Sequence, residues 1–432
     1  MKRLVMTKKT AAIGMTVAIA MASALAGCGT GGSDGTVITL SANLIEKPGM
    51  DAAIADFEEA NPGVTVQPAY AAQSDRGPVL STQIQAGSGP DIVGLVGGSG
   101  APPSVFQFAE GGKLSDLSSA PWAGDLPEFT KPAVTFEEKV SALPSLTYVV
   151  ASIYNVTLFE RLGLEVPQTF DQMVAACGAI RDNDPDLIPI AWPGTSPVYI
   201  IDAIMTAAMG EVYAQNPDWD AQRDRGEVKF QTTPGWKDAV EHIVRLREAE
   251  CFGPSTASDT YQQSVAQVAG EQAAMLIGGD ILLPVVRAAN AEAQFGIFPL
   301  PGETEEKTHV LLDPAGNFAL NESSQNADAA RAFLDFLATP EQSDRFAASI
   351  GTVSRQDYAR SSDPDVAREA LGDDHALLAP YSSRFVLNPS YTWPSSTIVS
   401  ALADAGQGLF TGQLTADDVL KAADDAWDQS ID

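Results

Sequence analysis

An alternation of strand and helix patterns near the start of this 432-residue chain constrains its fold more than any other feature. Three segments read as strands: 37–42 (VITLSA), 64–69 and 91–96 (DIVGLV). Apolar residues at helical spacing between them predict a helix over 50–57 and another over 79–84. Strands joined by helices through short links favour an α/β fold with a parallel sheet and right-handed crossovers.

In a parallel sheet of this kind, ligands bind at the loops that leave the carboxyl ends of the strands. Here those loops are residues 43–49, 70–77 and 97–103. The alternation therefore predicts where a binding site lies before any relative is considered.

The same alternation continues beyond residue 150, which predicts a second unit of the same class. Strands are expected at 187–191, 273–277 and 295–299. Helices are expected at 169–181, 200–209, 236–250, 326–337, 340–349, 395–410 and 416–429. At roughly 150 residues per domain, the length agrees with two or three domains.

Composition narrows the class of function. The chain is 45% hydrophobic and 19% charged, which is typical of a globular protein. Its 26 basic and 56 acidic residues give a net charge of −30, so a surface that neutralises phosphates is not available and nucleic-acid binding is excluded.

The first 27 residues have the pattern of an export signal. A basic start is followed by the uncharged run 11–26, which is too short for a comfortable membrane span. The sequence Leu25-Ala-Gly-Cys28 resembles the lipobox of bacterial lipoproteins, which implies that Cys28 becomes the first residue and carries lipid. We expect 1–27 to be a lipoprotein signal peptide and 28–36 a flexible tether to the outer face of the cytoplasmic membrane. The alternative is an ordinary secretory signal that contains a cysteine.

The remaining cysteines fit export. With Cys28 assigned to lipid, an oxidising compartment favours a disulfide between Cys177 and Cys251, and two buried free thiols are the alternative. Neither cysteine has one of the three histidines close in sequence. No metal site, cofactor or Cys-His nucleophile is therefore expected.

Six motifs, in order, are spread over most of the chain after the signal. They are 57–66 (FEEANPGVTV), 83–93 (QIQAGSGPDIV), 143–169, 270–279 (GEQAAMLIGG), 295–301 and 330–343. Their order and spacing resemble the extracellular solute-binding proteins of ABC importers, in the sugar-binding cluster like maltose-binding protein.

This resemblance implies a two-lobe periplasmic-binding-protein-like fold of type II, each lobe a central β-sheet flanked by helices, with a hinge between them. We place lobe one at 37–148 plus 310–355 and lobe two at 149–309 plus 356–432. It further implies a monomer that closes on a sugar between the lobes, presents it to the permease of an ABC transporter, and catalyses no reaction.

A sugar needs aromatic platforms for its C–H faces and planar polar side chains for its hydroxyls. Five polar residues in the strand-exit loops are candidates from lobe one: Asn43, Glu46, Gln73, Arg76 and Ser99. The first two match the first ligand loop of the resembled family. The alternative for each is a solvent-facing loop residue.

Aromatic candidates come from lobe two. Trp192 follows a strand and precedes a Pro-Gly turn, so we expect it to be displayed, and Trp393 resembles the C-terminal stacking aromatic of the family. Tyr199 and Tyr391 are further candidates. Asp280 stands where the family commonly has an aromatic, as a carboxylate ligand or a helix N-cap.

Other functions remain as alternatives. The same fold could bind a glycerol phosphate or another small anion through Arg76 and Arg384, or present its ligand to a receptor. An exported hydrolase is disfavoured because Gly97–Ala101 (GGSGA) breaks the Gly-x-Ser-x-Gly pattern at its last position, and no His-Glu-x-x-His or P-loop motif occurs.

The sequence also yields a mutational expectation. If Trp192 and Trp393 are ligand platforms, their replacement by alanine weakens sugar binding and leaves the fold intact. Titration calorimetry together with a melting curve checks both halves of this statement.

Overall fold

A computed structural model of the chain describes residues 35–71, 73–100, 102–361 and 366–431. The signal segment, Cys28 and nearly all of the tether lie outside these residues. The described residues, from Gly35 onward, form one compact unit. Among the described residues, no helix is both long enough and apolar enough to cross a membrane.

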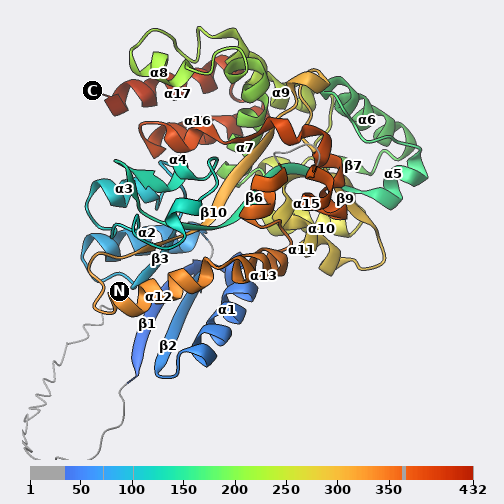
Figure 1. Ribbon diagram of the computed structural model, residues 1–432. Helices are drawn as coiled ribbons and strands as arrows, with labels where there is room; N and C mark the ends of the chain where they lie inside the picture. Colours follow the sequence, from blue (N-terminus) through green and yellow to red (C-terminus); the bar gives the residue numbers. More distant parts are fainter. Residues whose placement is uncertain (1–34, 72, 101, 362–365, 432) are drawn as a thin grey trace, which may run out of the picture. The chain divides into compact units, whose positions relative to one another are not determined.

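The described unit is built on one nine-stranded sheet with the order β2-β1-β3-β10-β6-β8-β7, to which β9 adds on β6 and β11 on β10 (Figure 1). Its strands are β1 (Thr36–Asn43), β2 (Val64–Ala71), β3 (Ile92–Leu95), β6 (Leu143–Asn155), β7 (Ile188–Ala191), β8 (Ala273–Gly279), β9 (Phe295–Pro299), β10 (Val310–Leu320) and β11 (Phe385–Leu387). The pair β4 (Thr135–Phe136) and β5 (Lys139–Val140) forms a separate small hairpin. Strand β1 pairs in parallel with both β2 and β3, which confirms the parallel sheet predicted for the first unit.

Helices surround this sheet close to where the sequence predicts them. The α-helices are α1 (Lys47–Ala60), α2 (Gln73–Gln85), α3 (Val105–Glu110), α4 (Lys131–Val134), α5 (Val156–Leu162), α6 (Phe170–Asn183), α7 (Pro197–Ala208), α8 (Trp219–Asp224), α9 (Pro234–Glu248), α10 (Tyr261–Ala269), α11 (Leu283–Ala289), α12 (Ala327–Leu337), α13 (Pro340–Ile350), α14 (Arg355–Ser361), α15 (Ala367–Leu371), α16 (Ser396–Thr411) and α17 (Ala416–Ile431). The remaining helical turns are η1 (Leu44–Glu46), η2 (Ala123–Asp125), η3 (Met209–Tyr213), η4 (Thr256–Ser258), η5 (Asp280–Leu282), η6 (Glu305–Lys307), η7 (Asp373–Arg384) and η8 (Pro389–Thr392). Although α12 and α13 come late in the chain, they lie beside α1 and the first three strands (Figure 1).

Two long strands connect separate packing centres. The first part of β6 places Leu143 and Leu146 in the core around β1–β3, α1 and α12. Its second part places Val150 and Tyr154 in a core formed with α6, α7, α9, α16 and α17. Strand β10 divides in the same way, since Phe318 packs with the first core and its amino end packs with the others. This arrangement suits the two lobes expected from the sequence, whose boundaries stay a prediction.

A disulfide joins α6 to the segment after α9. Cys177 and Cys251 are both fully buried, and their Cα atoms are 5.2 Å apart. The prediction that these two cysteines pair is confirmed, and the alternative of two free thiols is wrong.

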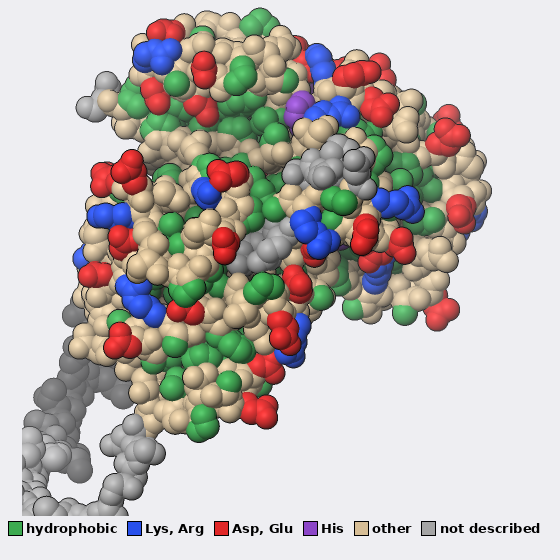
Figure 2. Space-filling view, viewed as in Figure 1, with side chains coloured by type: hydrophobic (Ala, Val, Ile, Leu, Met, Phe, Trp, Pro, Cys, Tyr) green, Lys and Arg blue, Asp and Glu red, His purple; other side chains and the backbone are tan. Residues whose placement is uncertain are grey.

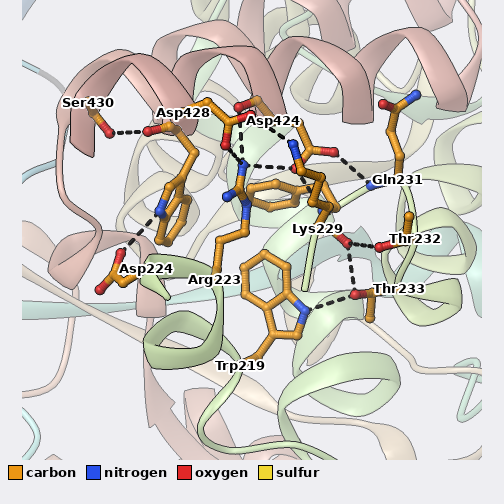
Figure 3. Close-up of polar contacts among 12 residues, drawn as sticks. Trp219, Arg223, Asp224, Lys229, Gln231, Thr232, Thr233, Asp424, Asp428 and Ser430 are labelled. Carbon is orange, nitrogen blue, oxygen red and sulfur yellow. Dashed lines mark hydrogen bonds and ion pairs between the residues drawn. The ribbon is translucent and has the colours of Figure 1, made fainter. Parts of the chain in front are cut away.

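A buried arginine ties α8 to the C-terminal helix α17 (Figure 3). The Arg223 side chain is 1% exposed, and its Nη2 lies 3.2 Å from Asp424 Oδ1 and 2.6 Å from Asp428 Oδ1. The Asp424 carboxylate also accepts hydrogen bonds from the backbone N–H groups of Phe230 and Gln231. Arg223 therefore neutralises a carboxylate that the fold has removed from water.

We expect Arg223→Ala to lower the free energy of unfolding by about 3–5 kcal/mol, because it leaves the Asp424 charge buried without its partner. The matched control is Arg225→Ala, which removes an ion pair with Glu227 whose side chains are 56% and 53% exposed. This control is expected to cost far less, because an ion pair between exposed side chains contributes little to stability. Urea denaturation measures both values, and equal losses would contradict the assignment.

Candidate functional site

A cavity of about 270 Å³ lies at the carboxyl ends of β1 and β3, where the parallel sheet predicts a binding site. Residues of all three predicted loops line it: Asn43 and Glu46 from the first, Arg76 from the second and Gly100 from the third. Tyr391 lines the cavity as well. Four of the predicted ligand-binding residues therefore lie around it: Asn43, Glu46, Arg76 and Tyr391.

The rest of the wall comes from later parts of the chain. It consists of Leu95, Val96, Tyr148, Val198, Ile201, Asp202, Pro314, Ala315, Gly316, Asn317, Asn388, Ser390, Val399, Ser400 and Ala403. Strands β6 and β10, helices α7 and α16 and the turn η8 therefore all contribute. In Figure 2 the surface is hollowed between α16 and α4, hydrophobic side chains gather there, and acidic side chains are scattered over the rest of that face.

One wall of the cavity holds a buried acid and a buried base, Glu46 and Arg76, whose charges interact. Glu46 is 5% exposed, and its Oε2 accepts a hydrogen bond of 2.7 Å from the backbone N–H of Asn43, which caps η1. Arg76 donates from Nη1 to the carbonyl of Gly94 at 2.7 Å. Burial raises the pKa of Glu46, and the nearby Arg76 opposes that rise. Burial also lowers the pKa of Arg76, while Glu46 opposes that change.

Two further buried carboxyl groups lie at the cavity: Asp202 lines it, and Asp313 is the neighbour of Asp202 outside the lining. Asp313, on β10, is fully buried and accepts a 2.9 Å hydrogen bond from the Tyr148 hydroxyl. Asp202, on α7, is 1% exposed. Burial raises the pKa of Asp313 to about 6. Burial, together with the neighbouring Asp313, raises the pKa of Asp202 well above its ordinary value. The two groups therefore do not ionise independently.

Sequence reasoning missed this pair. Asp202 is the only charged residue within α7 (PVYIIDAIMTAA), and a lone acid in an otherwise apolar helix was the available signal. For Asp313, no local signal existed, because its position beside Asp202 depends on how β10 pairs with β6 and on where α7 packs.

The loop that carries Tyr391 is tied to the third strand-exit loop. The backbone N–H of Ser99 donates to the carbonyl of Tyr391 at 2.8 Å, and the Ser99 hydroxyl donates to the carbonyls of Tyr391 and Trp393. Ser99 thus fixes the loop and does not itself line the cavity. The side chain of Gln73 lies outside the described part of the chain.

Both tryptophans lie in the core. Trp192 is 1% exposed and packs edge-to-face on Phe252 and Phe410, so the expectation that it is displayed is wrong. Trp393 is also 1% exposed, and it packs against an aromatic cluster made of Phe230, Trp236 and Trp427. Neither lines the cavity, nor does Tyr199, which is partly buried. A strand-exit position does not prevent a large aromatic ring from packing back onto its own core.

Asp280 lies in a network of protein groups away from the cavity lining. It is fully buried and accepts hydrogen bonds from the Val149 N–H at 3.1 Å, the Thr352 hydroxyl at 2.7 Å and the Tyr358 hydroxyl at 2.9 Å, with His375 Nε2 at 3.0 Å. The N-cap of η5 is Gly279, so the N-cap alternative for Asp280 is wrong. Its contacts join β6, α14 and η7 around one carboxylate.

No group of three or more His, Cys, Asp or Glu side chains suited to a metal ion occurs among the described residues. The chemistry that the cavity can perform is that of reversible binding. Hydrogen-bonding groups and apolar surface from early and late parts of the chain converge on one cavity.

Comparison with known proteins agrees with this geometry. Residues 41–344 match the family model of the bacterial extracellular solute-binding proteins. The chain belongs to this family. Its members are solute-binding transport proteins and not enzymes, and the resemblance seen in the motifs is confirmed.

Individual relatives are distant. The chain is 22% identical over 360 residues to the multiple sugar-binding protein of Streptococcus mutans, covering 81% of this chain and 80% of that one. It is 22% identical to the diacetylchitobiose binding protein DasA of Streptomyces coelicolor over 60% of this chain and 62% of that protein.

Solved structures share the fold. RafE in complex with raffinose has a TM-score of 0.75 at 18% identity, covering 92% of this chain and 100% of that one. A solute-binding protein of Thermotoga lettingae bound with α-D-tagatose has a TM-score of 0.75 at 19% identity, with the same coverage. The α/β fold with two lobes is thereby confirmed.

The burial of the tryptophans reverses the mutational expectation drawn from the sequence. We now expect Trp192→Ala and Trp393→Ala each to lower the free energy of unfolding by about 3–5 kcal/mol, because each leaves a cavity in the core. Chemical denaturation measures this loss. Two variants as stable as the parent protein would contradict the placement of both rings.

The acid pair predicts a dependence of stability on pH. Because the pKa of Asp313 is raised from 3.8 to about 6 in the folded protein, the folded state keeps a proton that the unfolded state releases near pH 4. Its contribution to stability is present below about pH 4 and is lost as the pH rises through 6. Asp313→Asn should therefore gain stability relative to the parent between pH 4 and 7, by up to roughly 3 kcal/mol. Asp404→Asn, which removes one exposed acid on α16, is the matched control for the loss of a single carboxyl group.

Proposed function

We propose that this chain is the extracellular solute-binding lipoprotein of an ABC transporter and captures a short carbohydrate in the cavity between its two lobes. One observation carries the proposal: hydrogen-bonding side chains from the sheet edge of β1–β3 and from α7 and η8 converge on one cavity. A ligand that contacts both walls favours the closed arrangement of the lobes over an open one. The closed, loaded form is what the permease then recognises.

The lining suits a carbohydrate. Asn43, Asn388 and Ser390 offer the planar amide and hydroxyl groups that bind sugar hydroxyls, and the rings of Tyr148 and Tyr391 offer flat apolar faces. At about 270 Å³ the volume lies near the lower end for ligand pockets, which favours a mono- or disaccharide over a long chain. The curated relatives named above as sugar-binding and diacetylchitobiose-binding proteins support the same substrate class.

A small anion is less well supported. Arg76 is the only basic residue in the described lining, and the pKa effects show that Glu46 offsets its charge. Arg384, the other basic candidate, donates to the carbonyl of Glu305 and lies over the Tyr381 ring, outside the lining. A phosphate ester would therefore find one basic side chain in the described lining, with an acidic group already beside it.

The substrate class can be tested with a thermal-shift screen of residues 29–432 against monosaccharides, disaccharides, longer oligosaccharides and glycerol phosphates. A ligand that binds only the folded state raises stability by about 2.7 kcal/mol at a hundredfold excess over its dissociation constant. We expect one or a few short sugars to raise the melting temperature. A rise in melting temperature with glycerol phosphate alone would indicate an anionic ligand. No rise with any compound would contradict the proposal.

The cavity itself can be tested by filling it. Ser400 is a half-buried residue of α16 that lines the cavity. The larger side chain of Ser400→Trp should therefore reduce the affinity for the sugar at least tenfold while the protein stays folded. The matched control is Ser400→Ala, which leaves the space open and should bind within about threefold of the parent. Calorimetric titration with the sugar found in the screen measures both. Unchanged binding by Ser400→Trp would contradict the location.

The lipid anchor can be tested separately. Because thioether lipidation requires the cysteine sulfur, Cys28→Ser should move the exported protein from the membrane fraction to the soluble exported fraction. Immunoblots of fractionated cells measure the distribution. A variant that stays in the membrane fraction would support an ordinary signal and a different mode of attachment.

A further inference from the structure

Three consecutive residues of the third strand-exit loop enclose Tyr391, and the proposed function does not account for them. They are Gly98, Ser99 and Gly100, from the segment that breaks the Gly-x-Ser-x-Gly pattern. Tyr391 and Gly100 line the cavity, whereas Ser99 is 7% exposed and lies outside the lining. The tripeptide therefore contacts a residue of the cavity wall from the protein side.

Each of the three residues constrains Tyr391 in a different way. At Gly98 the backbone has a φ of +52°, a conformation that favours glycine, and an added Cβ would overlap the Tyr391 carbonyl oxygen. The N–H of Ser99 donates to that carbonyl at 2.8 Å, and the Ser99 hydroxyl donates to it at 3.1 Å. At Gly100 an added Cβ would lie 2.9 Å from Tyr391 Cε1 and 3.0 Å from Cδ1. This is well inside the optimal carbon–carbon separation of about 3.5–4.0 Å, so the ring packs directly on the glycine backbone.

The loop that encloses Tyr391 is itself anchored on both sides. The N–H of Gly98 donates to the Ala133 carbonyl of α4 at 2.6 Å, and the Phe106 N–H of α3 donates to the Gly98 carbonyl at 3.0 Å. The Ser99 hydroxyl also donates to the carbonyl of Trp393, whose ring is buried in the core formed with α7, α9, α16 and α17. Tyr391 is therefore held by groups that belong to two different packing centres.

We infer that Gly98-Ser99-Gly100 sets the affinity of the cavity for its sugar by holding the Tyr391 ring in place against the ligand, with Ser99 and Gly100 as positioning residues. This inference rests on the proposed function and deepens it. An aromatic ring that packs on the C–H face of a sugar contributes most when it is already in place, because ordering a mobile side chain on binding costs affinity.

Gly100→Ala tests the inference, because the added methyl group would displace the ring and leave the polar lining unchanged. We expect the affinity for the sugar found in the thermal-shift screen to fall at least tenfold, measured by calorimetric titration of residues 29–432. The matched control is Gly124→Ala, at an exposed site where an added Cβ meets no atom within 4 Å, and it should bind within twofold of the parent. Ser99→Ala removes the hydroxyl and keeps the N–H, so it should weaken binding by about threefold to tenfold.

A methyl group at Gly100 would also lower affinity if it entered the cavity and met the ligand directly. A double-mutant cycle with Tyr391→Leu separates the two causes. If the methyl group acts through the ring, adding Gly100→Ala to Tyr391→Leu should lower the affinity less than twofold further. A further loss as large as in the parent background would overturn the inference.

Fluorine NMR of protein labelled with 3-fluorotyrosine measures the environment of the ring without any ligand. The chain has nine tyrosines, so the Tyr391 resonance is identified as the one missing from Tyr391→Phe. Gly100→Ala should shift this resonance, and Gly124→Ala should leave it in place. An unchanged resonance in Gly100→Ala would overturn the inference, because the ring would not depend on the glycine.

The outcomes separate the two proposals. If the parent protein binds a sugar and Gly100→Ala binds it equally well, the inference is overturned and the proposed function stays. If no sugar in the screen binds the parent protein, the carbohydrate function is contradicted, and the fluorine resonance still decides whether the loop positions Tyr391.

Discussion

The antiparallel pairing of β6 with β10 is the interaction on which the rest of the structure depends. These two strands are paired from Leu143 to Val149 on one side and from Leu312 to Phe318 on the other. Each strand begins in one hydrophobic core and ends in another. The pair therefore holds the two cores in register while leaving each to pack by itself, which is what a two-lobe binding protein needs.

The same pairing builds the floor of the cavity. Tyr148 of β6 pairs with Asp313 of β10. The next residues of β10, Pro314 to Asn317, line the cavity. At Gly316 the backbone has a φ of +55°, a conformation that favours glycine, and an added Cβ would lie 2.5 Å from the Ser145 hydroxyl and 3.3 Å from Glu46. The strand thus bends where the wall needs close approach, so the scaffold and the site share the same residues.

The two buried acids at the cavity, Asp202 and Asp313, lower the stability of the fold. Burying Asp202 beside Asp313 raises the pKa of both and removes hydrogen-bond partners that water would supply. Elsewhere the fold satisfies its buried acids, as it does for Asp280 with four partners and for Asp424 with Arg223. Asp202 and Asp313 instead hydrogen-bond to each other, and Asp313 also accepts from the Tyr148 hydroxyl.

Much of the fold could be predicted from the sequence because the signals are local. Apolar periodicity placed the helices and strands, and the parallel order of β1, β2 and β3 placed the edge at which Asn43, Glu46 and Arg76 meet. The spacing Thr415-x-x-Asp418 predicts a capping box at the start of α17, and its two reciprocal hydrogen bonds are formed. These features depend on neighbours a few residues away.

Other features of the site depend on distant packing and could not be predicted. A tryptophan after a strand is compatible with display or burial, and only the ring contacts of Trp192 with Phe252 and Phe410 decide between them. Asp202 and Asp313 are 111 positions apart, so their proximity follows from the sheet order and the placement of α7.

The central claim, that one cavity between the two cores takes a small carbohydrate, is tested most directly by a crystal structure of residues 29–432 with the sugar that stabilises the protein. The account predicts density for that sugar between Asn43 and Glu46 on one wall and Asp202 and Asn388 on the other. A sugar bound elsewhere, with this cavity filled only by solvent, would contradict the account.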